Sequence, residues 1–205
     1  MSSLESKRYL GGRSWAELTR EKRHFCEVLA AQARRNPLAL VRRLKQLAPG
    51  RLDLLESGDP GTWDAAADVY LYRDVLWHQG REGRPPRFSP QRAFDACLFG
   101  TRDLVIIEAA LDQPFDVVSA NVAREDRKRL PDLLGEACPR IWLCAVAPAA
   151  HLERGGAQAS AAFADVAISW RELNNLYGEP RLLQADRMYL EAQRLLAPPR
   201  LEGRG

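Results

Sequence analysis

Lysine is scarce in this chain, although basic residues as a class are not. Of the 30 basic residues, 26 are arginine, and the four lysines are Lys7, Lys22, Lys45 and Lys128. The formal net charge of +3 is mild. Any chemistry that needs an ammonium group must therefore draw on very few positions.

Long apolar runs are also missing. No run reaches 18 residues, so the sequence predicts no membrane-spanning helix. The charged N-terminus is not followed by an apolar segment, which predicts no secretory signal and a cytosolic protein. The four cysteines form no CxxC pair, and their spacing fits no zinc template. Neither a Ser-His-Asp pattern, a P-loop nor a dinucleotide fingerprint is present, so the acidic residues become the main candidates for chemistry.

The length of 205 residues and the 46% hydrophobic share fit one domain with trimmings at its ends. We expect an N-terminal helical extension over 1–55, an α/β core over 56–197 and a tail over 198–205. The expected helices are 15–35, 37–47, 62–78, about 121–135, 169–178 and 182–196, and the expected strands are 94–99, 104–109, 141–147 and 163–168. Residues 80–91 read as a loop. This order predicts a mixed sheet with helices packed on it.

The most informative segment is a predicted hairpin in the middle of the chain. Two short apolar runs, 94–99 and 104–109, flank the turn 100–103. If the residues beside the turn pair with each other, paired positions sum to 203, and Asp95 lies opposite Glu108.

Opposed like charges destabilise a sheet. A protein that keeps such a pair usually neutralises it with a cation or shifts the pKa of one carboxylate. Each acid also shares its strand face with apolar residues that should be buried, so it needs a partner, a proton or a metal. The alternative is a sheet end at which Asp95 and Glu108 reach solvent beyond the core.

The run Phe94-Asp-Ala-Cys-Leu-Phe followed by Asp103-Leu-Val-Ile-Ile-Glu-Ala-Ala resembles the core hairpin of the PD-(D/E)XK nuclease superfamily, whose fold is called restriction-endonuclease-like. The resemblance covers roughly 62–170. It implies that Asp95 and Glu108 hold Mg²⁺ or Mn²⁺ and position a water. It also implies a further acid on a preceding helix, for which Asp68 is the first candidate and Asp74 the second.

The chain departs from that pattern at two points. The lysine of the family would fall at position 110, where this chain has Ala110. No strand is evident between the predicted helix 62–78 and Phe94, where the family has one. Three explanations stay open: Lys128 or Arg124 supplies a basic group that has migrated, the site is inactive and the fold serves as a binding or scaffold module, or the resemblance is accidental.

Basic residues cluster in the predicted helix 37–47. Arg42, Arg43 and Lys45, together with Arg124, are candidates for binding nucleic acid, although a solvated helix face explains them equally well. Two functions follow. The first is a nuclease-like protein that is impaired or inactive and binds nucleic acid or a protein partner. The second is an active Mg²⁺-dependent nuclease that cleaves DNA or RNA, with Asp95, Glu108 and Lys128 as its catalytic residues.

Overall fold

The structure is a computed structural model that describes residues 8–53, 55, 59–78, 91–112, 115, 117–135 and 138–196. Within these ranges, five strands form one mixed sheet in the order β3-β4-β5-β6-β7. The strands are β3 (Asp64–Val69), β4 (Phe94–Phe99), β5 (Asp103–Ala109), β6 (Arg140–Ala147) and β7 (Val166–Ser169), and a small separate hairpin pairs β1 (Arg8–Tyr9) with β2 (Arg13–Ser14). The helices are α1 (Trp15–Leu18), α2 (Lys22–Arg35), α3 (Pro37–Leu47), α4 (Leu71–His78), α5 (Val117–Leu134), α6 (Ala149–His151), α7 (Ala157–Ala161), α8 (Trp170–Tyr177) and α9 (Pro180–Leu196).

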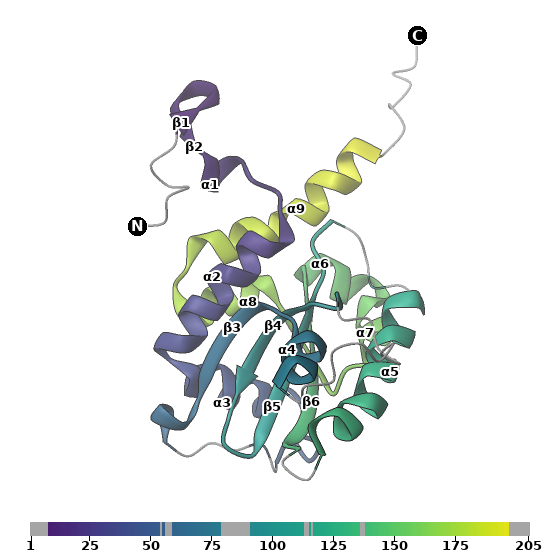
Figure 1. Ribbon diagram of the computed structural model, residues 1–205. Helices are drawn as coiled ribbons and strands as arrows, with labels where there is room; N and C mark the ends of the chain where they lie inside the picture. The colour runs from purple at the N-terminus through teal and green to yellow at the C-terminus, as the bar shows by residue number, and fades with distance from the viewer. Residues whose placement is uncertain are drawn as a thin grey trace, which may run out of the picture.

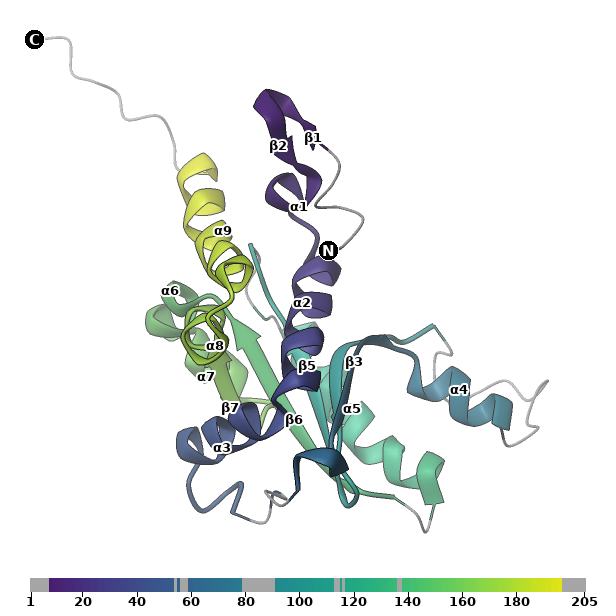
Figure 2. The same cartoon turned by 90° about the vertical axis from the view of Figure 1, so that its left-hand side faces the viewer.

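The sheet lies between two helical layers, as Figures 1 and 2 show. Helices α2, α3, α8 and α9 cover one face, and their core contains the large side chains Phe25 and Trp170. Helix α5 covers the other face, where Ile106 and Leu143 of the sheet pack against Leu130. The predicted mixed α/β sheet with flanking helices is therefore confirmed.

The predicted hairpin register is also found. Strands β4 and β5 are antiparallel, with Ala96 opposite Ile107 and Phe99 opposite Leu104, so paired positions do sum to 203. Asp95 lies one position beyond the last recorded pair. Strands β5, β6 and β7 are parallel, and α5 connects β5 to β6 as a crossover helix.

The prediction of one helix over 62–78 is wrong in its first half. Residues 64–69 form β3, which pairs antiparallel with β4, and the α-helix is confined to Leu71–His78. The apolar positions of this segment fit a helix locally, but pairing with β4 satisfies the backbone along the sheet edge and overrides the local preference. Asp68 is thus a strand residue, with an unusual positive φ of 55°.

The predicted helix over 15–35 is divided into α1 and α2. Ser14 and Glu17 form a capping box that begins α1, and Thr19 adopts an extended conformation that ends it. The segment 163–168 was expected as a strand, and β7 begins only at Val166. The capping box of Ser169 and Glu172 begins α8 as predicted, and Gly178 ends it with a φ of 64°.

Helices α2 and α3 belong to the core, although the sequence suggested an N-terminal extension. They contribute Phe25, Leu29, Leu40 and Leu44, all fully buried, to the layer that covers the sheet. The loop predicted over 80–91 lies outside the described residues except for Gln91.

A buried carboxylate fixes the start of the parallel pair β5 and β6. The Asp103 side chain is fully buried and accepts hydrogen bonds from Nε and Nη2 of Arg140 and from Nε1 of Trp142, each at 2.8 Å. Such charge-assisted bonds are stronger than neutral ones. Asp103 therefore links the turn of the hairpin to the first residues of β6.

We expect Asp103→Ala to lower the free energy of unfolding by about 3 kcal/mol, because it leaves three donors without their buried acceptor. Urea unfolding monitored by circular dichroism measures this change. Asp64→Ala is the matched control: it also removes an Asp–Arg pair, but the Asp64 side chain is 71% exposed, so its loss should cost less than about 1 kcal/mol. Equal losses for the two variants would contradict the assigned role of Asp103.

Candidate functional site

Asp95 is held at the start of β4 by a lysine from the first helical layer. The Lys22 ammonium, at the first turn of α2, lies 2.8 Å from both carboxylate oxygens of Asp95. Oδ2 of Asp95 also accepts the backbone N–H of Ala109 at 2.8 Å. Asp95 thereby joins α2 to the end of β5, and its charge is compensated although its side chain is only 16% exposed.

Glu108 is compensated by a different cation. Arg92, two residues before β4, forms an ion pair with Glu108 and a second one with Asp126 of α5, at 3.0 Å. The other oxygen of Asp126 accepts the hydroxyl of Tyr72 at 2.5 Å. A continuous polar network therefore runs from β5 through Arg92 to α5 and α4.

The environment of Glu108 makes its proton unusually tightly held. Burial raises the pKa of the Glu108 carboxyl from 4.5 to about 7, the Arg92 guanidinium acts in the opposite direction, and the nearby Asp95 charge raises it further. The pKa of Tyr72 is also raised, first by burial and then by its hydrogen bond to Asp126. An acid of this kind can exchange a proton near neutral pH.

Glu108 lines a pocket of about 480 Å³ beside the carboxyl end of β5. We call it the acid pocket, and it is lined by Arg20, Lys22, Arg92, Glu108, Ala109, Ala110, Leu111, Asp112, Phe115, Val118, Val122 and Phe163. The carboxyl ends of parallel strands are a common place for ligands in open α/β sheets. The acid pocket thus combines a usual binding position with three cations and two carboxylates, those of Glu108 and Asp112.

Asp68 does not complete a metal centre with the two acids. It pairs with Arg23 at 3.0 Å, and among the described residues no group of three or more His, Cys, Asp or Glu side chains is placed to hold a metal ion. Asp74, the second candidate, is exposed on α4 and pairs with Arg73. Asp95 and Glu108 remain as the minimum donor set, since Mg²⁺ is often bound through one or two carboxylates together with substrate phosphates and water.

Ala110 occupies the position where the resemblance implies a lysine, and it lines the acid pocket. Its N–H continues the sheet ladder to the Val146 carbonyl at 2.8 Å, and its own carbonyl accepts Nε1 of Trp170 at 2.8 Å. The backbone at this position is therefore fixed at the pocket wall, but the side chain contributes no charge.

The two basic residues proposed as migrated groups lie elsewhere. Lys128 pairs with Glu125 on α5 at 3.3 Å and is 72% exposed. Arg124 donates to the carbonyl of Ala162 and to Asn121. Both line a separate pocket, on the β7 side of α5, and neither lines the acid pocket.

The basic residues of α3 are partly engaged in contacts within the fold. Arg43 pairs with Glu172 of α8, and the Lys45 ammonium donates to the carbonyl of Leu55 at 3.0 Å. Arg42 is exposed. Two of these three side chains therefore fasten α3 to its neighbours, and their proposed role in binding nucleic acid gains no support from these contacts.

The sequence reasoning missed the residues that neutralise the two acids. Lys22 stands 73 positions before Asp95, and no local pattern joins them. The scarcity of lysine was the available signal, because only four positions had to be considered. Arg92 lies two positions before the first strand of the predicted hairpin, and this closeness in sequence was its signal.

Neither a protein-family model, nor a curated protein, nor a solved structure matches this chain. In the part of the chain that the structure describes, no helix combines the length and the apolar character needed to cross a membrane.

The raised pKa of Glu108 predicts a pH-dependent stability. Since the folded protein binds this proton more tightly than the unfolded chain, the stability it provides is lost as the pH rises from about 4.5 to 7. Relative to Glu108→Gln, which stays neutral, the wild type should lose on the order of 2 kcal/mol of unfolding free energy across that range. Urea unfolding at a series of pH values measures the difference.

Glu172→Gln is the control for this experiment. Although burial opposes it, the Arg43 hydrogen bond lowers the pKa of Glu172, so the stability from this group is lost only as the pH falls below about 4.5. The difference between wild type and Glu172→Gln should therefore be flat between pH 5 and 7. A flat difference for Glu108→Gln as well would refute the assignment.

Proposed function

We propose that this chain is a nuclease-like protein with a restriction-endonuclease-like core, which acts in the cytoplasm, binds nucleic acid at the acid pocket and does not cleave it efficiently. The observation that carries the proposal is that Glu108 and Ala110 line the acid pocket, with Asp95 held beside them by Lys22 and by the backbone N–H of Ala109. Two acids remain where the resemblance requires them, and the neighbouring lysine is replaced by a residue without charge.

The strand order supports the nuclease-like reading. The resemblance calls for a strand before the hairpin and for a helix and strand after it, and the chain has β3, β4, β5, α5 and β6 in that order. β3 supplies a strand before the hairpin, although it lies inside the segment 62–78 that was predicted as a helix and α4 stands between it and β4. This order of elements makes an accidental resemblance a weaker explanation than it was from the hairpin alone.

The pocket lining favours nucleic acid over a protein partner. Arg20, Lys22 and Arg92 place three cations around an opening at the strand ends, and cations are the usual contacts for phosphates. Arg20 already pairs with Glu191 of α9 at 3.0 Å, but it is 53% exposed and can exchange partners.

Efficient cleavage needs a group that stabilises the attacking hydroxide or the charge developing on the phosphate. Ala110 cannot supply that group. We expect purified wild type to leave single- and double-stranded DNA and RNA intact with Mg²⁺ or Mn²⁺, and Ala110→Lys to gain metal-dependent cleavage, measured on labelled oligonucleotides. Ala110→Met is the control, because it adds a chain of similar length without the charge.

The gain should disappear when Glu108→Ala is added to Ala110→Lys. Because Ala110 is buried and its backbone is part of the sheet, a larger side chain there could disturb folding. Circular dichroism therefore checks that each variant is folded. Cleavage by the wild type at a rate comparable to that of Ala110→Lys would contradict the proposal.

An active nuclease is the second candidate, and one observation favours it. Lys22 lies 2.8 Å from Asp95 and lines the acid pocket with Glu108, so an ammonium group from another helix stands beside both acids. In this reading Asp95 and Glu108 would hold Mg²⁺, which supplies positive charge to the phosphate and an activated water. Lys22 would then stabilise the developing negative charge in place of the residue at 110.

Two substitutions distinguish Lys22 from Lys128 as the catalytic lysine. If wild type cleaves, Lys22→Met should lower kcat by on the order of 10²-fold, as loss of one charge-stabilising group does. Lys128→Met should leave kcat unchanged, because Lys128 lies in another pocket. Initial rates with Mn²⁺ at saturating oligonucleotide measure both. The reverse result would restore Lys128 as the catalytic lysine and remove Lys22.

A further inference from the structure

A second concave surface lies on the β7 side of α5, and it is strongly basic. It has a volume of about 440 Å³ and is bounded by residues 161–165, which lead from α7 into β7. Of the described residues that line it, four are cations, Arg51, Arg124, Arg127 and Lys128, and one is an acid, Asp165. We call this surface the basic pocket.

Two helical layers contribute to the basic pocket. Arg124, Arg127 and Lys128 lie three and four residues apart on α5, so they share one face of that helix. Arg51 follows α3, which belongs to the layer on the other side of the sheet. The cations therefore converge beyond β7, the last strand of the described sheet. Such convergence from distant segments is not expected of a solvated helix face.

Two of the guanidinium groups in the basic pocket are held by hydrogen bonds to uncharged backbone carbonyls. Nη1 of Arg51 donates to the backbone carbonyl of Asp165 at 3.2 Å, and Nε of Arg124 donates to the carbonyl of Ala162 at 3.1 Å. A carbonyl carries no net charge, so these bonds hold each group in place and leave its positive charge. Arg127, by contrast, pairs with the Asp165 carboxylate.

We propose that the basic pocket binds a phosphate group, and that in the cell this phosphate belongs to a nucleic acid strand that also enters the acid pocket. Arginine forks match phosphate oxygens and bind them with strong, directional hydrogen bonds. Phe163 lines both pockets, so the two pockets are neighbours. The choice of nucleic acid as the source of the phosphate rests on the proposed function. The phosphate site itself rests on the convergence of the four cations, of which Arg51 and Arg124 are held by carbonyls, Arg127 pairs with Asp165 and Lys128 pairs with the partly exposed Glu125.

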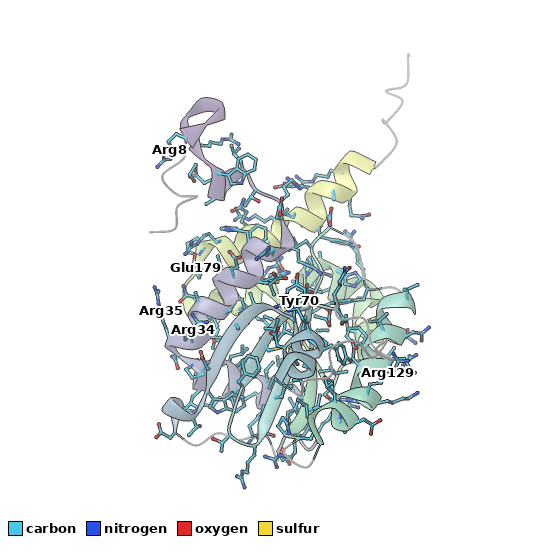
Figure 3. The ribbon with its side chains drawn as sticks, viewed as in Figure 1. Arg8, Arg34, Arg35, Tyr70, Arg129 and Glu179 are labelled. Atoms are coloured by element: carbon cyan, nitrogen blue, oxygen red, sulfur yellow. The ribbon has the colours of Figure 1, made fainter. Side chains whose placement is uncertain are left out.

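The test compares wild type with the double variant Arg124→Ala/Lys128→Ala. Both side chains are exposed, so the variant should fold like the wild type. The control is Arg35→Ala at the end of α2, in the opposite helical layer, and Figure 3 shows Arg35 on the other side of the molecule from Arg129 of α5. Circular dichroism verifies the fold of all three proteins.

The first measurement uses pyrophosphate as the probe and chloride at matched ionic strength as the reference. A ligand that binds only the folded state raises Tm. We expect pyrophosphate to raise Tm of the wild type and of Arg35→Ala by several degrees, and to leave the double variant unchanged. Equal shifts in all three proteins, or none in any, would overturn the phosphate site.

The second measurement follows the binding of a labelled single-stranded oligonucleotide as a function of salt. Loss of two phosphate contacts should weaken binding at least tenfold and reduce the slope of log K against log salt by about 1.4. Polyglutamate of matched charge serves as competitor, and displacement of the oligonucleotide by polyglutamate at equal concentration would favour an acidic protein and overturn the assignment to nucleic acid. A pyrophosphate shift that depends on Arg124 and Lys128, with no oligonucleotide bound by wild type, would uphold the phosphate site and refute the proposed function.

Discussion

Asp95 and Glu108 come together at the end of the central hairpin, and the sheet tolerates them there because each is paired with a cation. Lys22 reaches Asp95 from α2, and Arg92 reaches Glu108 from the segment before β4. Two acids this close and this little exposed would otherwise repel each other and lose hydration without compensation. Burial still raises the pKa of Glu108, so compensation is incomplete, and a carboxyl that titrates near neutral pH remains at the pocket.

The same requirement joins the layers of the fold. Arg92 also pairs with Asp126, and Asp126 accepts the Tyr72 hydroxyl, so the charge pairing extends from β5 to α5 and α4. Lys22 makes the corresponding connection from β4 to α2. Removing one member of such a network leaves its partner buried and uncompensated, which costs far more than the pair contributes by itself. The acid pair therefore constrains the position of elements on both faces of the sheet.

Buried acids recur at the other end of the sheet, where they have a structural use. Asp103 accepts hydrogen bonds from Arg140 and Trp142, and Asp165 accepts the backbone N–H of Leu143 and pairs with Arg127. Each lies next to β6, the central parallel strand. Asp103 is fully buried, whereas Asp165 borders the basic pocket and Glu108 borders the acid pocket. Glu108, with Asp95 beside it, is therefore a candidate for function as well as for stability.

The sequence by itself determined the features that depend on neighbouring residues. The apolar runs and the turn defined the hairpin and its register, and Ser169 with Glu172 defined the start of α8, because strand alternation and helix capping act over a few residues. Tertiary structure alone decided that 64–69 is a strand, since β3 exists through its pairing with β4. It also decided which cations meet the acids. Lys22 is 73 residues from Asp95, and an ion pair over that separation forms only when the packing of α2 on the sheet brings the two charges together.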